Sequence, residues 1–436
     1  MPSPTVDPNL AEALRELGCA GATELVLGGM PARDLAQRFG TPLYVFDAAV
    51  LARRVARVRA ALGPRVELLW SVKANPSLAV TRCLRLAGTG AEVASLGELH
   101  LALAAGHAAA ALRFAGPGKT DAEIDAAVGL GLGCFHAESR SEVAAIAAAA
   151  ARHGTRVAVA VRVNLPQELA GARMRMGGRS SRFGVDAEQV PALLRAIGAD
   201  ARLQLAGLHV YAGTQCFDAA AFVQHAQQLV VHAERWERDL GLALCELDLG
   251  GGFGTALFED DPVFDLDAAG RGVRELVAAH DRADRRWFVE LGRYLAAPAG
   301  VYLTRVVRTK TSGAQRHAAL DGGMHQAAAA AGVGTVLRRA PLVVHATRLG
   351  EPAGDSVALG GPLCTPADQF GSAVPLPPLA EGDLVALLGA GAYGLSYSPH
   401  TFLSHATPAE VLVGDGPPRL ARQRGSARDV LRDQAP

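Results

Sequence analysis

The sequence lacks the features that mark membrane and nucleic-acid-binding proteins. Its 436 residues carry 43 acidic and 43 basic side chains, so the formal net charge is zero. No block of Lys and Arg offers a surface for nucleic acid. No apolar run approaches the roughly 18 residues of a membrane span, and the longest candidate, 143–151, is bounded by Glu142 and Arg152. We therefore expect neither nucleic acid nor a membrane as a partner.

Cysteine is also scarce. The six cysteines include no C-x-x-C pair, which favours reduced thiols over a disulfide framework. Residues 1–21 show no basic stretch followed by an apolar one, so no signal peptide is visible. Both absences predict a soluble cytoplasmic protein. Half of the residues are apolar and 49 are glycine, which allows two or three domains with sizeable cores and makes an enzyme the leading class.

Short apolar runs of β type alternate with Ala-rich amphipathic stretches through the first two-thirds of the chain. Strict alternation implies parallel strands joined by right-handed crossovers. Eight such units over about 230 residues fit an α/β fold of the (β/α)8 barrel type better than an open sheet. The predicted strands are 66–71, 91–94, 112–115, 134–137, 157–163, 204–210, 246–249 and 287–291, and the predicted helices are 76–87, 96–105, 121–129, 141–153, 187–197, 219–240 and 266–283.

After residue 296 the pattern changes to short strands broken by Gly and Pro. These strands are predicted at 301–309, 318–320, 342–346, 356–359, 384–388 and 410–413, with a further one at 44–47. The Ala-rich stretch 326–331 predicts a helix, and residues beyond 414 read as a fraying tail. We expect residues 48–298 to form the barrel, and 1–47 with 299–436 to form a mostly β domain.

A lysine stands where the first predicted barrel strand ends, in W-S-V-K-A-N-P at 70–76. Active sites of such barrels form at the carboxyl ends of the strands. A lysine at a strand end is most often a solvated surface charge. Here apolar neighbours on both sides predict a desolvated ammonium with a lowered pKa, which a lysine that forms a Schiff base requires.

Two loops that follow the last predicted barrel strands suggest an anion site. D-L-G-G-G-F-G at 248–254 has consecutive glycines, which let backbone N–H groups converge on a phosphate. Barrels commonly bind phosphate after strands seven and eight. A tight turn is the plainer interpretation. The next loop, E-L-G-R-Y at 290–294, offers the Glu290 carboxylate, for which an ion pair with Arg293 is the simpler explanation.

Other polar residues end predicted strands, and each has a plain explanation. His209 ends the sixth strand and fits a satisfied core histidine; Arg162 ends the fifth and fits an internal ion pair, with Glu92 as a candidate partner. No metal site is predicted, because His136, His209 and His325 are isolated in the sequence. Motifs for mononucleotides and NAD are missing. A lysine, a carboxylate, a phosphate loop, a histidine and an arginine together are the inventory of a pyridoxal phosphate site.

The order of five motifs resembles the fold-type III pyridoxal phosphate decarboxylases, the group of diaminopimelate, ornithine and arginine decarboxylases. The motifs are S-V-K-A-N at 71–75, the glycines at 250–254, E-x-G-R at 290–293, G-P-L-C at 361–364 and G-A-Y-G at 391–394. The resemblance implies an alanine-racemase-like barrel followed by a β domain, with pyridoxal 5'-phosphate as cofactor. It also implies a head-to-tail homodimer with shared active sites.

The resemblance assigns roles to single residues. Lys73 would attach to the cofactor and be displaced by the substrate amine, Glu290 would keep the pyridine nitrogen protonated, and His209 would stack on the ring. Cys364 of the other subunit would protonate the carbanion left by loss of CO2. The other implied contacts are, to the cofactor, Glu92, Arg162, Gly250, Gly251, Gly252, Gly254, Gly292, Arg293 and Tyr393, and, to the substrate, Asp321, Arg293, Cys364 and Asp368.

Several positions depart from the diaminopimelate decarboxylases. Their C-E-S-x-D is C-T-P-A-D at 364–368, their H-x-G-S-Q is two residues longer here, and Leu291 replaces the proline of E-P-G-R. Their R-P-x-x-Y stretch is not recognisable after Met324. The pattern is similar to a separate branch associated with exosortase loci and antibiotic pathways. Some members of that branch act on aminoacyl groups tethered to an acyl carrier protein.

We therefore predict an α-decarboxylase of specialised metabolism that acts on an acidic amino acid held by an acyl carrier protein. The loop with Arg173, Arg175, Arg179 and Arg182 would steer an acidic carrier, although a solvated loop without a partner is the plainer interpretation. The alternatives are a decarboxylase of free diaminopimelate, ornithine or lysine, an amino-acid racemase, and a non-catalytic pyridoxal-phosphate-binding protein. The cysteine of G-P-L-C counts against the racemase.

Overall fold

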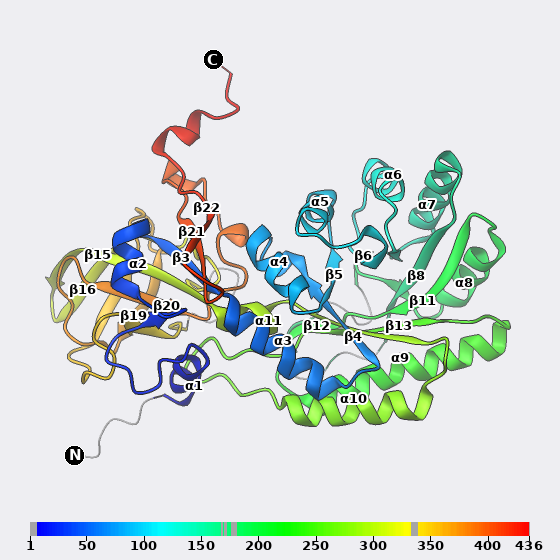
Figure 1. The fold of residues 1–436 in the computed structure, drawn as a ribbon, viewed down its shortest axis with the longest axis horizontal. Helices are drawn as coiled ribbons and strands as arrows, with labels where there is room; N and C mark the ends of the chain where they lie inside the picture. Colours follow the sequence, from blue (N-terminus) through cyan, green and yellow to red (C-terminus); the bar gives the residue numbers. More distant parts are fainter. Residues whose placement is uncertain (1–6, 167–168, 170–171, 176–180, 333–338, 436) are drawn as a thin grey trace. The chain divides into compact units, whose positions relative to one another are not determined.

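The computed structural model describes residues 7–435, except for 167–168, 170–171, 176–180 and 333–338 (Figure 1). The chain divides into two compact units. One holds residues 1–53, 256–261 and 295–436, and the other holds 54–255 and 262–294. The sequence-based domain boundaries at 48 and 298 stay a prediction.

The unit of residues 54–255 and 262–294 is a closed barrel of eight parallel strands with helices around it (Figure 1). The strands follow the order β4-β5-β6-β7-β8-β11-β13-β14, and the ring closes between β14 and β4. This confirms the predicted (β/α)8 barrel. The strands are β4 (Val66–Ser71), β5 (Gly90–Val93), β6 (Leu112–Phe114), β7 (Cys134–Ala137), β8 (Val157–Asn164), β11 (Leu203–His209), β13 (Glu246–Gly251) and β14 (Arg286–Leu291).

The barrel helices begin and end where the sequence provides caps. Thr120 and Glu123 form a capping box at the start of one helix, and Ser139 caps the next, which ends at Gly154 in the left-handed conformation. Such caps satisfy the unpaired N–H and C=O groups of helix ends. The helices are α3 (Ala48–Leu62), α4 (Leu78–Leu86), α5 (Leu96–Ala104), α6 (Asp121–Gly129), α7 (Arg140–His153), α8 (Val190–Ala199), α9 (Ala219–Leu240), α10 (Leu266–His280) and α11 (Arg293–Ala296).

The loops of the barrel carry short strands that the sequence did not reveal. β9 (Ala172–Arg175) and β12 (Gly213–Cys216) form an antiparallel ribbon, and β10 (Val185–Asp186) adds to β8. None of these three segments is a continuous apolar run of the kind that marks the predicted barrel strands. The ribbon joins the loops after β8 and β11, so these two loops support each other.

The other unit is mostly β, as predicted. Its main sheet has the order β19-β18-β16-β15-β3-β21-β22, and β20 pairs with β15 and β17. The predicted strand at 44–47 is β3 and lies between β15 and β21. The elements are α1 (Pro8–Glu16), β1 (Val26–Leu27), β2 (Met30–Pro31), α2 (Ala32–Phe39), β3 (Leu43–Asp47), β15 (Gly300–Ser312), β16 (Gln315–Leu320), β17 (Val343–His345), β18 (Val357–Gly360), β19 (Gln369–Val374), β20 (Leu384–Leu388), β21 (Ala409–Val413) and β22 (Arg419–Arg422).

Two expectations for this unit are wrong. Residues 326–331 form turns rather than a helix, because Tyr44 Oη donates to the carbonyl of Gln326 and Tyr302 Oη donates to its side-chain oxygen. The chain beyond 414 does not fray, since β22 pairs with β21 and the Arg424 guanidinium donates to the carbonyl oxygens of Phe39 and Pro42.

Two smaller expectations concern cysteines and membranes. All six cysteines are free thiols, as the sequence predicted. Within the described part of the chain, no helix has both the length and the apolar character needed to cross a bilayer.

Candidate active site

Four buried side chains form one layer inside the barrel. Glu92 lies on β5, His136 on β7, His209 on β11 and Glu290 on β14, which are the second, fourth, sixth and eighth strands of the ring. Each residue is 2% exposed or less. In a (β/α)8 barrel, alternate strands contribute the side chains of one interior layer. Closure of the sheet therefore brings together residues that are far apart in the sequence.

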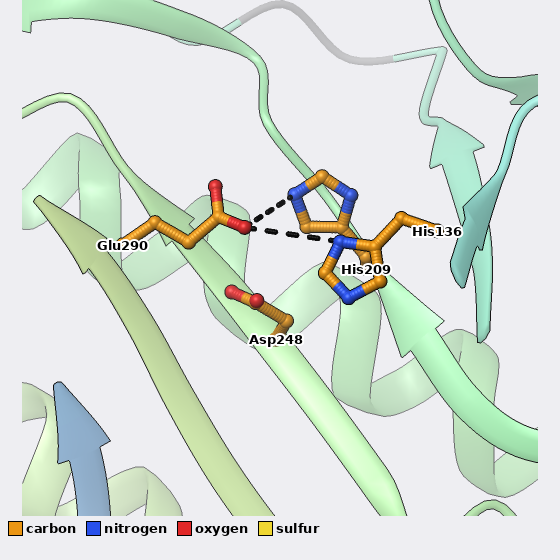
Figure 2. A group of neighbouring side chains, drawn as sticks. All are labelled: His136, His209, Asp248 and Glu290. Atoms are coloured by element: carbon orange, nitrogen blue, oxygen red, sulfur yellow. Dashed lines mark ion pairs between the residues drawn. The ribbon is translucent and has the colours of Figure 1, made fainter. Parts of the chain in front are cut away.

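The carboxylate of Glu290 meets two stacked imidazoles (Figure 2). Its Oε1 lies 3.4 Å from Nε2 of His209 and 3.8 Å from Nδ1 of His136. The two rings stack with centroids 4.2 Å apart and planes inclined by 24°. Asp248 from β13 completes a group whose ligand atoms lie within 4.8 Å of one another. His136 and His209, which are isolated from each other in the sequence, therefore meet in the fold.

Burial and neighbouring charges shift the pKa values of Glu290 and Asp248 in opposite directions. Burial would raise the pKa of Glu290, but its interactions with His209 and then with Lys73 hold this pKa below its usual value. Burial, and then the negative charge of Glu290, raise the pKa of Asp248 well above its usual value. These opposite directions favour the ionised form of Glu290 and the protonated form of Asp248. Neighbouring groups with pKa values pushed apart are typical of sites that handle protons.

Lys73 lies in the single turn that follows β4, η1 (Val72–Ala74). Its Nζ lies 3.0 and 3.1 Å from the two carboxylate oxygens of Glu92, and 5.2 Å from the ring centre of Tyr211. The side chain is 35% exposed. The expected desolvation by apolar neighbours is therefore wrong: Val72 and Ala74 are buried, while the ammonium faces a carboxylate at the open end of the barrel.

Arg162 has a different partner from the one expected. Its Nη1 lies 2.9 Å from Oε1 of Glu138, whereas Glu92 pairs with Lys73. Glu138 also accepts hydrogen bonds from the backbone N–H groups of Gly116 and Gly184. The Arg162–Glu138 pair therefore ties three loops together at the strand ends. The predicted ion pair exists, with Glu138 in place of Glu92.

The glycine-rich loop after β13 is shaped by close contacts with its neighbours. Gly250 and Gly252 have φ values of 69° and 85°, which favour glycine, and a Cβ on Gly251 would collide with the carbonyl oxygen of Glu290. The N–H of Gly250 donates to Asp248 Oδ1 at 2.9 Å, and that of Gly254 donates to the carbonyl of Cys216 at 2.7 Å. These two N–H groups are engaged within the protein.

The loop after β14 packs against the turn of Lys73. A Cβ on Gly292 would come within 2.8 Å of the Cβ of Ala74, so glycine permits this approach. Arg293 follows as the first residue of α11. The loops after the first and eighth strands therefore meet beside Lys73, where the predicted phosphate contacts of Gly292 and Arg293 would be made.

The remaining predicted residues lie in the mostly β unit, and their place at the barrel site stays a prediction. Asp321 Oδ1 accepts from the N–H of Arg305 at 2.8 Å, and its Oδ2 accepts from Thr41 Oγ1 at 2.5 Å. Cys364 is exposed. Tyr393 has a φ of 54°, which is unusual for a residue with a side chain.

Asp368 connects the loop of Cys364 to a second loop. Its Oδ1 accepts from the N–H of Met324 at 2.6 Å, and its Oδ2 accepts from the N–H of Leu363 at 2.8 Å. Side chains on Gly323 or Gly361 would collide with this carboxylate. Asp368 therefore stabilises the G-P-L-C loop from within.

Comparison with known proteins agrees with this architecture. Residues 48–297 match the family described as pyridoxal-dependent decarboxylase, pyridoxal binding domain. The chain belongs to the pyridoxal-dependent decarboxylases. Among these decarboxylases, the L-glutamyl-[BtrI acyl-carrier protein] decarboxylase of Niallia circulans is 36% identical over 92% of this chain and 95% of its own. The diaminopimelate decarboxylase of Zymomonas mobilis is 31% identical over 94% of this chain and 96% of its own.

Solved structures of decarboxylases share the whole fold. The diaminopimelate decarboxylase of M. jannaschii in complex with L-lysine superimposes with a TM-score of 0.87 at 25% identity, covering 95% of this chain and 96% of that one. The protein is a pyridoxal-phosphate-dependent amino-acid decarboxylase, as its motifs predicted.

Sequence reasoning missed three residues of this decarboxylase site. Asp248 lies within D-L-G-G-G-F-G but has no predicted role, His136 is far from the other histidines in the sequence, and Glu138 has no predicted role. All three lie in β7 or β13 or directly after β7. The available signal was the rule that polar residues at the carboxyl ends of barrel strands face the active site.

Proposed function

We propose that this decarboxylase removes CO2 from an acidic aminoacyl group held as a thioester on an acyl carrier protein, in a biosynthetic pathway of specialised metabolism. The proposal for the site rests on one observation: neither carboxylate oxygen of buried Glu290 has a hydrogen-bond partner in the described structure. The nearest ion-pair partner, Nε2 of His209 at 3.4 Å, leaves this buried carboxylate without a close hydrogen bond, which is costly. A protonated pyridine nitrogen is a partner that satisfies it.

The other residues fit the same cofactor. Pyridoxal phosphate, when bound, accepts the electron pair that loss of CO2 leaves at Cα. Lys73 would hold its aldehyde carbon through Nζ, and His209 would lie against the ring. Glu290 would hold a proton on the pyridine nitrogen. Cys364 would give a proton to Cα, and Gly292 and Arg293 would bind the phosphate.

The carrier-bound substrate is supported by the relative from Niallia circulans, whose name states a glutamyl group on an acyl-carrier protein. The basic loop offers a surface for an acidic partner. Arg173 and Arg182 are exposed, and their guanidinium groups lie 5.0 Å from the ring of Phe217 and 4.8 Å from that of Phe183. The other two predicted arginines, Arg175 and Arg179, lie outside the part whose side chains are described.

Turnover of free and carrier-bound glutamate tests this substrate. We expect CO2 release from glutamyl carrier protein and little from free glutamate. The double variant Arg173→Ala/Arg182→Ala should lower kcat/KM for the carrier substrate about tenfold at low salt and less at high salt, because steering is screened. The matched control is Arg238→Ala, which removes an exposed arginine of α9. Equal or better turnover of free diaminopimelate, ornithine or lysine would contradict the proposal of a carrier-bound substrate. It would favour a second function, the decarboxylation of a free amino acid, which the relative from Zymomonas mobilis supports.

We further propose a cytoplasmic homodimer in which each active site takes Cys364 from the partner. To test the shared site, the Lys73→Ala and Cys364→Ala chains are unfolded, mixed in equal amounts and refolded together. Half of the dimers are then mixed and each has one intact site, so about a quarter of wild-type activity should return. No recovery, with mixed dimers present by mass spectrometry, would place both residues in one subunit. Each variant refolded alone is the control.

A further inference from the structure

His136 is held in the floor of the site by contacts on several sides. Its ring stacks on that of His209, at 4.2 Å between centroids (Figure 2). Its backbone carbonyl accepts a hydrogen bond from Lys119 Nζ at 2.9 Å, and the same Nζ lies 2.6 Å from Oε1 of Glu142. The ring is 2% exposed. His136 therefore presents a fixed plane to its neighbour.

His209, by contrast, lacks hydrogen bonds that set its orientation. Among the described residues, neither Nδ1 nor Nε2 of His209 has a hydrogen-bond partner, although Nε2 lies 3.4 Å from Glu290 Oε1. Besides its ion pair with Glu290, such an imidazole depends on packing for its orientation, because rotation about χ2 of a histidine is soft. The packed surface that it meets is the ring of His136.

We infer that His136 is a positioning residue of the decarboxylase: its ring backs His209 and fixes the plane that His209 offers to the cofactor. The inference rests on the proposed contact of His209 with the pyridine ring. The order of layers would be pyridine, His209, His136. Stacking of flat rings defines the orientation of one ring relative to the other.

The charges around His136 agree with a packing role. Burial, and then the positive charge of His209, hold the pKa of His136 well below its usual value, so its ring is neutral. Arg113 and Lys119 act in the same direction, whereas Glu290 opposes them. Because a neutral His136 does not compensate the negative charge of the Glu290 carboxylate, His209 and the pyridine nitrogen would be the partners of that carboxylate. Among the described residues the Nδ1 of His136 has no hydrogen-bond partner, and its distance of 3.8 Å from Glu290 Oε1 is longer than that of His209 Nε2.

Two substitutions of similar volume separate the flat ring from mere filling of the core. His136→Phe keeps a stacking plane without nitrogens, and His136→Leu fills the space without a plane. In the holoenzyme we expect His136→Leu to lower kcat about tenfold with KM within about twofold, since a misplaced contact acts on the reacting geometry. The visible circular-dichroism band of the bound cofactor should weaken. In His136→Phe, kcat and the dichroism band should stay near those of the wild type.

Two results would overturn the inference that His136 positions His209. A Phe variant as impaired as the Leu variant would assign the role to the nitrogens and overturn the inference. So would a Leu variant with wild-type kcat and an unchanged dichroism band. His107→Leu, at another buried histidine of the barrel unit, controls for a general loss of packing. If the wild type released no CO2 from free or carrier-bound amino acids, the proposed function would fail first, independently of His136.

Discussion

Replacing Lys73 by Ala is expected to abolish the absorbance band of protein-bound pyridoxal phosphate and to lower CO2 release by about 10³-fold or more. Covalent attachment and an acid–base group are lost together. The chain has only three lysines, which makes the test clean. Lys119 is buried and paired with Glu142, and Lys310 lies on β15 in the other unit. Lys73 is the lysine at the strand end beside Glu92.

Two measurements check this attachment. Borohydride reduction of the wild-type holoenzyme, followed by peptide mapping, should find the pyridoxyl group on Lys73. Lys310→Ala is the matched control and should keep the band and the activity. Persistence of the band in Lys73→Ala would refute Lys73 as the attachment point.

Neutralising Glu290 should have the second largest effect. Glu290→Gln keeps the shape of the side chain and removes its charge, so kcat should fall about 10²–10³-fold, the usual cost of one well-placed electrostatic group. The physical reason is that an amide does not hold a proton on the pyridine nitrogen. Steady-state kinetics should show most of the loss in kcat rather than in KM.

Asp248 provides a matched control for this charge. Burial and Glu290 raise the pKa of Asp248, which favours its neutral form, so we expect Asp248→Asn to change the charge of the group less than Glu290→Gln does. The amide oxygen still accepts the N–H of Gly250, which Asp248 Oδ1 accepts in the native protein. Asp248→Asn should therefore lower kcat by less than about tenfold. Equal losses in the two variants would show that shape rather than charge matters in this group.

The sequence predicted the elements of the barrel because each depends on local periodicity. β4 and β7 begin and end at the predicted residues, and Lys73 and His209 stand at strand ends as expected. The pairing of polar side chains did not follow from the sequence. Lys73 with Glu92, Arg162 with Glu138 and His136 with His209 each join different strands or loops, and only closure of the sheet decides which of them meet.

The helix prediction for 326–331 was wrong because tertiary contacts outweighed local helix propensity. The Ala-rich stretch 326–331 has a high intrinsic helix propensity, yet two buried tyrosine hydroxyls bind Gln326 and fix turns there. The two rings of Tyr44 and Tyr302 pack 4.7 Å apart, so these bonds come from a rigid part of the β unit. Helix propensities amount to less than about 1 kcal/mol per residue and yield to such contacts.

The layer of alternate strands has a consequence for folding. Glu92 and His136 come from the first half of the barrel, and His209 and Glu290 come from the second. A half-barrel therefore holds only part of the layer in which we propose that the cofactor binds. A ligand stabilises the state that binds it in proportion to its affinity for that state. If pyridoxal phosphate binds to this layer, it should stabilise the complete ring of eight strands relative to forms that lack one half of the barrel.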